Sequence, residues 1–193
     1  FDEVTASNLV TIDLDGNTVN PGTGESEIDV NITGFVIHGA VHSAREDVRC
    51  VMHSHSNGGM AVSALREGLI PMQIDGMMFL DRVAYHNFEG LSDATEECDR
   101  LAASLGEWDT MILRNHGLLT CGETVGAAFM RMYYLERACN IQLRVMATGR
   151  DITFPSDAVC ERTAKQLTRF PLGQYEWPAI LRRVQSECPD YNR

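Results

Sequence analysis

The sequence predicts an α/β or α+β domain in which helices cover a sheet. Segments with the two-residue period of strands alternate along it with segments of helical period. At 193 residues and 44% hydrophobic, the chain is long enough to bury one sizeable core. No internal repeat, low-complexity tract or linker rich in proline and glycine divides it. Residues 1–193 are therefore expected to form a single domain.

The first half of the chain predicts a hairpin, a helix, a strand and a short helix. Two strand-like runs in LVTIDLDGNTV flank the turn signal Asp15-Gly16-Asn17. From Thr33 to Ala44 apolar residues recur at helical spacing, and Thr33 is placed to cap that helix. The apolar run CVMHSH then predicts a strand, and a short helix follows from Met60 to about Arg66.

The second half continues the alternation. Strands are expected at three stretches: MQIDGMMFL (72–80), RVAYHNF (82–88) and TMILRNHG (110–117). A helix between the last two is capped by Ser92 and ended by Gly106. The longest helix runs from Val125 to about Thr148, and another covers about 156–169 before an aromatic tail.

Charge argues against two classes of binding partner, and cysteine usage indicates a cellular compartment. With 16 basic and 27 acidic side chains the net charge is −11, which opposes binding to nucleic acid or to an anionic membrane. The apolar runs are too short to span a bilayer, and no leader opens the chain. Six dispersed cysteines without a Cys-x-x-Cys pair suit reduced, inert thiols, so we expect a cytosolic protein. Because the sequence begins at Phe1 without a methionine, we expect a natural N-terminal segment to be missing.

The stretch VMHSHSNGG (51–59) carries the first chemical signal. Alternate residues of a strand share a face, so His53 and His55 would project side by side and could hold one ion. His116 closes another expected strand and precedes Gly117, which would let the chain turn away. Three imidazoles and an open fourth position describe a catalytic zinc site better than a structural one. The alternative is that these histidines are polar strand ends satisfied by backbone hydrogen bonds.

A second histidine pair lies on the helix expected after Thr33. His38 and His42 are four residues apart and so share a helical face, which would allow them to chelate a metal. No glutamate follows His38, so the base of a helical metalloprotease motif is absent. We therefore expect His38 to hydrogen-bond near the pocket, and His42 to pack or face solvent.

Together these residues resemble the class II aldolase and adducin head-domain family. The resemblance runs through four stretches: GFVIHGAVHSAREDVRCVMHSHS, IPMQIDGMMFLDRVAYHNFEG, MILRNHGLLTCGETVGAAFMRMYYLERAC and EWPAILRR. It implies a three-layer α/β/α sandwich around a largely antiparallel mixed sheet. It also implies a divalent metal on His53, His55 and His116, with zinc favoured and manganese, iron or cobalt also suited to imidazole. A homo-oligomer, with a tetramer favoured and the site near the subunit boundary, follows from the same resemblance.

The activity that this resemblance implies is that of a metal-dependent lyase. Such an enzyme breaks a carbon–carbon bond through a metal-stabilised enolate or enediolate, here on a small hydroxy-carbonyl or carboxylate substrate. Two alternatives stay open. One is a sugar-phosphate aldolase proper, and the other is a non-catalytic interaction module of the adducin kind.

Departures from the family pattern bear on that choice. The glutamate that carries a proton in the sugar-phosphate aldolases aligns with Gly34, and two phosphate-holding hydroxyl positions align with Ile32 and Thr33. One of those hydroxyls is therefore lost. We expect Thr33 and Asn115 to contact substrate, and the missing proton carrier to be replaced by His38 or by a metal-bound water.

Overall fold

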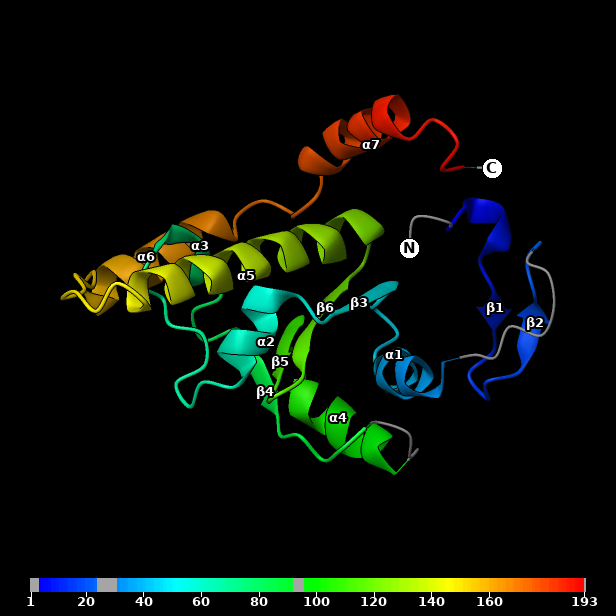
Figure 1. Cartoon of the computed structure of the whole chain (residues 1–193), viewed down its shortest axis with the longest axis horizontal. Coiled ribbons are helices and arrows are strands. Elements are labelled where there is room, and N and C mark those ends of the chain that lie inside the picture. The colour runs from blue at the N-terminus through cyan, green and yellow to red at the C-terminus, as the bar shows by residue number, and fades with distance from the viewer. Residues whose placement is uncertain (1–3, 24–30, 92–95, 193) are drawn as a thin grey trace.

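A four-stranded sheet lies at the centre of the computed structural model, which describes residues 4–23, 31–91 and 96–192 (Figure 1). Its strands are β3 (Cys50–Ser54), β4 (Ala84–His86), β5 (Thr110–Leu113) and β6 (Gly117–Gly122). They are ordered β3-β6-β5-β4. β6 runs antiparallel to both β3 and β5, and β4 runs parallel to β5. The sheet is therefore mixed and largely antiparallel, as predicted.

Helices cover both faces of this sheet. α1 (Ile32–Ala44) and α4 (Glu97–Leu105) pack on one face, and α2 (Asn57–Ser63) and α5 (Val125–Met146) pack on the other. Alternate strand residues divide between the two layers, since Met111 and Leu119 join the first cluster and Ile112 and Leu118 join the second. The predicted three-layer α/β/α sandwich is confirmed.

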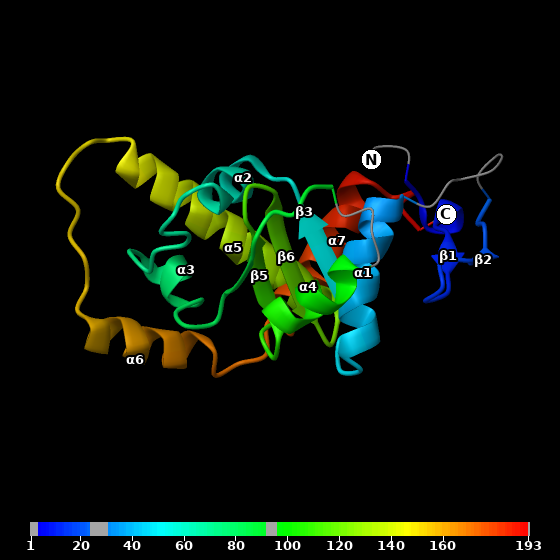
Figure 2. The same ribbon diagram turned by 90° about the horizontal axis from the view of Figure 1, so that it is seen from below.

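The N-terminal segment and the C-terminal helix lie outside these layers. β1 (Thr11–Ile12) and β2 (Thr18–Asn20) form the predicted hairpin, which Figures 1 and 2 show beyond α1. A 3-10 turn, η1 (Ala6–Asn8), precedes it, and the amide of Ala6 donates to the carbonyl of Tyr191 at 3.2 Å. The first and last parts of the described chain are therefore in contact.

The remaining helices follow or flank α5. They are α3 (Ile74–Met77), α6 (Asp157–Leu167) and α7 (Glu176–Glu187). α7 lies on the outer side of α5 (Figure 1), where the ring of Trp177 packs at 5.4 Å from that of Phe129. A Cβ at Gly126 would collide with Trp177, so the close approach of α7 to α5 requires glycine there.

Several expected elements differ from those observed. Asn31, not Thr33, caps α1, because its side chain accepts hydrogen bonds from the amides of Thr33 and Gly34. Residues 72–80 form α3 and turns instead of a strand, and there the Gln73 side chain caps the amide of Asp75 at 2.6 Å. Short apolar runs do not separate strand from helix by period alone, and local side-chain capping decides this one.

Other differences concern boundaries. α2 begins three residues before the expected Met60, the strand β6 was not predicted, and the aromatic tail contains α7. His116 lies in the turn between β5 and β6 instead of ending a strand. The long helix and its cap at Thr124 are confirmed, as is the helix after Ser156. The predicted cap at Ser92 lies outside the described residues.

The cysteines are free, as expected for reduced thiols. Burial raises the pKa of the Cys121 and Cys139 thiols to about 12, so neither forms a thiolate at neutral pH. No helix in the described ranges is both long and apolar enough to cross a bilayer.

Candidate metal centre

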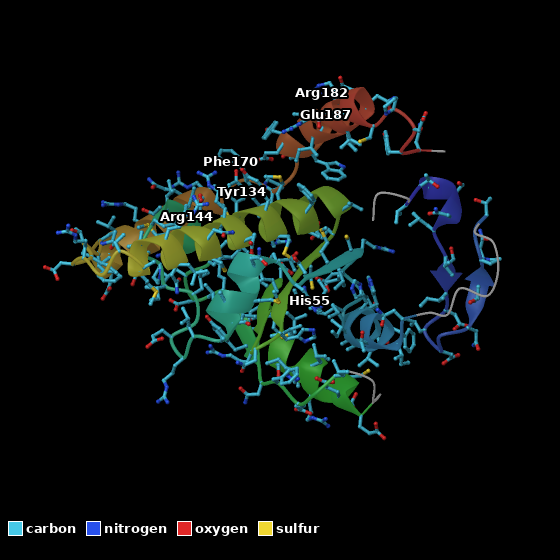
Figure 3. All side chains as sticks on the ribbon, viewed as in Figure 1. His55, Tyr134, Arg144, Phe170, Arg182 and Glu187 are labelled. Carbon is cyan, nitrogen blue, oxygen red and sulfur yellow. The ribbon has the colours of Figure 1, made fainter. Side chains whose placement is uncertain are left out.

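Three histidine rings converge at one end of the sheet. Their centroids are 4.7 Å apart for His53 and His55, 4.8 Å for His53 and His116, and 4.7 Å for His55 and His116. One ring nitrogen from each lies within 4.8 Å of the others. In the view of Figure 3, His55 lies near the centre of the molecule, between α2 and α1. Three imidazoles with an open side are a donor set that suits zinc and related divalent ions.

Sheet register explains why residues far apart in sequence meet here. His53 pairs with Leu119 and Ser54 with Leu118 across the antiparallel β3–β6 ladder. Continued by one residue, this register places His55 opposite Gly117, the first residue of β6. His55 therefore lies beside His116, which immediately precedes that glycine. His53 and His55 lie on the same side of the chain, as the two-residue period of a strand predicts, although His55 follows the last residue of β3.

The turn that holds His116 depends on its two neighbours. Asn115 adopts φ +56, a left-handed conformation that asparagine tolerates better than most residues. A Cβ at Gly117 would collide with the carbonyl oxygen of Ser54. The Asn-His-Gly sequence is therefore explained by the backbone conformation of this turn. The Asn115 side chain is exposed.

Burial favours the neutral form of His53 and His116, and a hydrogen bond orients the ring of His53. Nδ1 of His53 donates to the carbonyl of Leu118 at 2.9 Å, which leaves Nε2 for the cluster, 2.9 Å from Nε2 of His55. Burial lowers the pKa of His53 to about 4, with the neighbouring histidines adding to the shift. Burial also lowers the pKa of His116. Neutral imidazoles are the form that binds a metal.

Three α1 residues were singled out from the sequence, and they differ in how they relate to this centre. His38 is half-buried and close enough for its charge to act on His53, and burial lowers its own pKa. His42 lies one turn later and acts electrostatically on His38. The Thr33 hydroxyl donates to Oδ1 of Asn31 at 2.8 Å, so it takes part in the helix cap.

A glutamate that sequence reasoning missed fixes the chain just after His55. Glu136 of α5 accepts hydrogen bonds from the Ser56 hydroxyl at 2.5 Å and from the amides of Gly58 and Gly59 at 3.1 and 2.8 Å. Asn140 donates to the same carboxylate at 2.7 Å. These amides form the first turn of α2, whose free N–H groups favour an anion. Glu136 therefore anchors the segment that carries His55.

The larger cavities lie elsewhere. One of about 640 Å³ is lined by Ser54, Ser56 and α5, on the strand face opposite the triad. Another of about 510 Å³ lies between Trp108 and Phe170, at the opposite end of β5 from His116. His116 itself borders a small cavity of about 10 Å³, which His86 and Glu97 also line.

Fold and site together define the class of protein. The family profile described as "Class II Aldolase and Adducin N-terminal domain" matches residues 1–143, and the chain belongs to this family. A putative aldolase class 2 protein of Caulobacter vibrioides is 40% identical over 194 residues, covering 99% of this chain and 74% of that protein. Alpha-adducin of Rattus norvegicus is 40% identical over 150 residues, covering 77% of this chain but 20% of the adducin.

Solved structures of the same family are similar to this chain. An aldolase II superfamily protein from Pseudomonas syringae superposes with a TM-score of 0.90 at 42% identity, covering 98% of this chain and 76% of that one. L-fuculose 1-phosphate aldolase from Glaciozyma antarctica superposes with a TM-score of 0.85 at 29% identity, covering 98% and 73% of the two chains. The relatives therefore include an enzyme by name and a protein of the adducin group.

Proposed function

We propose that this protein is a metal-dependent lyase of the class II aldolase type, acting on a small hydroxy-carbonyl or carboxylate substrate. The convergence of His53, His55 and His116 carries the proposal. These residues would hold the ion, with zinc favoured over manganese, iron and cobalt. When bound, the ion would supply the positive charge that stabilises an enolate or enediolate.

The chain's own residues would transfer the proton and bind the substrate. His38 is neutral near pH 7 because burial lowers its pKa, and it lies within electrostatic reach of His53. We propose that it moves the proton that Gly34, without a side chain, cannot. Thr33 and Asn115 would contact the substrate.

Two other functions are each favoured by one observation. The fold similarity to L-fuculose 1-phosphate aldolase over 98% of this chain favours a sugar-phosphate aldolase. The 40% identity to alpha-adducin favours an interaction module without catalysis. Against the module stands the intact triad, because a scaffold has no need for three converging imidazoles.

Metal content tests the centre directly. Protein purified without chelator is expected to carry about one equivalent of a divalent transition metal per chain. His55→Ala and His116→Ala each remove a ligand and should lose most of it. His42→Ala is the matched control, since that histidine lies outside the triad, and it should keep its metal. Equal metal content in wild type and His55→Ala would contradict the assignment.

A substrate panel separates the three functions. Metal-loaded protein should be assayed against fuculose, rhamnulose and ribulose phosphates and against hydroxy-carboxylic acids. Turnover confined to carboxylates supports the lyase proposed here. Fast cleavage of a sugar phosphate would favour the aldolase and show that another group replaces the glutamate. No turnover on either panel would favour the interaction module.

We further propose that residues 1–193 act as one domain of a cytosolic homo-oligomer, with a tetramer favoured. Both core clusters pack on the one sheet, which supports a single unit. The six free cysteines support a reducing compartment.

A further inference from the structure

A cluster of buried polar side chains lies near His116, at strand β4, which is on the opposite side of β5 from β6. His86, at the end of β4, has Nε2 3.3 Å from Oε1 of Glu97 and Nδ1 2.9 Å from the Ser104 hydroxyl. The side chains of His86 and Glu97 are only 6% and 9% exposed. A carboxylate accepts, so Nε2 donates to Glu97. Glu97 and Ser104 both belong to α4, and the pair therefore ties that helix to the sheet.

Burial of Glu97 is costly without a compensating cation. Neither nearby arginine bonds this carboxylate, although the charge of Glu97 also acts on Arg100, one helical turn later. The Arg100 guanidinium binds Glu89, and that of Arg114 donates to the carbonyl of Leu65 at 2.6 Å and stacks on Tyr85. In the described part of the chain, Glu97 has His86 as its charged or polar side-chain partner and no arginine or lysine.

The same carboxylate faces the candidate metal centre. Glu97 and His116 line one cavity of about 10 Å³, closed on another side by Phe88, whose ring centroid is 6.1 Å from that of His116. This volume is about what one water molecule needs. The Glu97 charge also acts on His116, since it opposes the lowering of the His116 pKa by burial.

A metal-binding histidine usually donates its second ring N–H to a carboxylate, a carbonyl or a water, which fixes the ring and raises its basicity. His53 has the Leu118 carbonyl for this purpose. For His116 no such bond to another described residue is present. We propose that Glu97 is the outer carboxylate of the metal centre, positioning His116 through one water in the shared cavity, with His86 and Ser104 holding Glu97 in place.

This inference rests on the proposed function, because it takes His116 as a metal ligand. It makes Glu97 a positioning residue and not a catalytic one. A divalent ion held by His116 would also supply positive charge that offsets the buried Glu97 carboxylate.

Glu97→Gln tests the inference because it keeps the shape of the side chain and removes its charge. Glu96→Gln is the matched control, since Glu96 is exposed and adjacent on the same helix end. Zinc affinity, measured by competition with a chelator, should fall about 10–100-fold in Glu97→Gln and stay unchanged in Glu96→Gln. The visible spectrum of the cobalt(II)-loaded protein should shift only in Glu97→Gln, a change that a purely structural role would not produce.

Thermal unfolding of the metal-free variants shows whether Glu97→Gln folds. If it does not, Ser104→Ala replaces it, because loss of the hydroxyl frees His86 and loosens Glu97, and zinc affinity should fall in the same direction. Wild-type affinity and an unchanged cobalt spectrum in the folded variant would overturn the inference and leave the metal centre standing. Failure of the wild-type protein to bind zinc or cobalt would overturn both.

Discussion

At the residue scale, Gly34 decides between the two enzymatic functions. It is the third residue of α1, two positions after Ile32, and Asn31 caps the helix. An added Cβ there would have its nearest neighbour, Cγ of Asn31, at 4.0 Å. The position can therefore hold a side chain, and glycine is not required by the backbone.

Gly34→Glu should therefore stabilise the fold. Replacing glycine inside a helix gains roughly 0.5–1 kcal/mol, and a glutamate three residues after an asparagine cap adds the reciprocal hydrogen bond of a capping box. Urea unfolding should show a higher free energy of unfolding for Gly34→Glu than for wild type. Gly34→Ala separates the two effects, because it gains helix propensity without a carboxylate.

The same variant should gain weak cleavage of fuculose phosphate if the rest of an aldolase site is intact. A positioned general acid–base contributes on the order of 10²–10⁴-fold, so even partial placement should be measurable above wild type and Gly34→Ala. A stable Gly34→Glu protein that binds metal but cleaves no sugar phosphate would count against the aldolase reading.

The histidines of the site could be read from the sequence, whereas their supports could not. His53 and His55 share a short strand pattern, and Asn115 to Gly117 carry a turn signal. Glu136 bonds Ser56, 80 positions away, and no local pattern marks it. Glu97 likewise looks like an ordinary acidic residue at a helix start, and only the fold shows that it is buried against His86.

At the element scale, the short helix α2 depends on Glu136. With seven residues it is too short to be stable alone, and its capping residue Ser56 makes no cap hydrogen bond of its own. The Glu136 carboxylate takes that place through the Ser56 hydroxyl and two amides. α2 starts two residues after His55, so its anchorage and the metal site are coupled.

Glu136→Ala should lower both stability and zinc affinity. Hydrogen bonds to a charged group are each worth about 1.5–3 kcal/mol, and we expect a loss of about 2–4 kcal/mol in the free energy of unfolding, measured in urea. Arg144→Ala is the control on α5, since Arg144 is exposed and makes no hydrogen bond or ion pair with another described residue. A loss of stability with unchanged zinc affinity would show that His55 does not need this anchor.

Element prediction succeeded where the pattern was long and capped. α5, with 22 residues and Thr124 as its cap, begins at the predicted Val125 and ends at Met146, two residues before the predicted end. It failed for short runs such as 72–80, whose conformation depends on Gln73 bonding the backbone of Asp75. β6 was missed because all of its residues are buried, which removes the alternation that marks a strand.

At the scale of the whole molecule, the three-layer order followed from family resemblance and not from periodicity. Periodicity placed helices and strands but could not order them, since β3 pairs with β6 across more than sixty residues of chain. The sheet order β3-β6-β5-β4 is what brings His55 beside His116 and Glu97 behind it. The site could therefore not be assembled from the sequence without knowing the order of the strands.

Self-association is the last prediction, and α7 carries it. None of its described residues is buried, and apolar side chains on it and on its approach stay exposed: Phe170 (67%), Tyr175 (69%) and Leu181 (36%). Large apolar side chains left exposed on one element favour an interaction surface, and α7 lies on the outside of α5 (Figure 1). Light scattering at micromolar concentration should therefore give the mass of at least two chains, with four favoured.

Leu181→Glu should lower that mass, because it places a charge on the apolar side of α7. Val159→Glu is the control, since Val159 is a similarly exposed residue, at 37%, on α6. Circular dichroism should show both variants folded, so a change in mass reports association alone. If wild type were a strict monomer, or if both variants kept the wild-type mass, the α7 surface would not be the contact. If Leu181→Glu became monomeric and kept its metal but lost turnover, a second copy would be needed to complete the site.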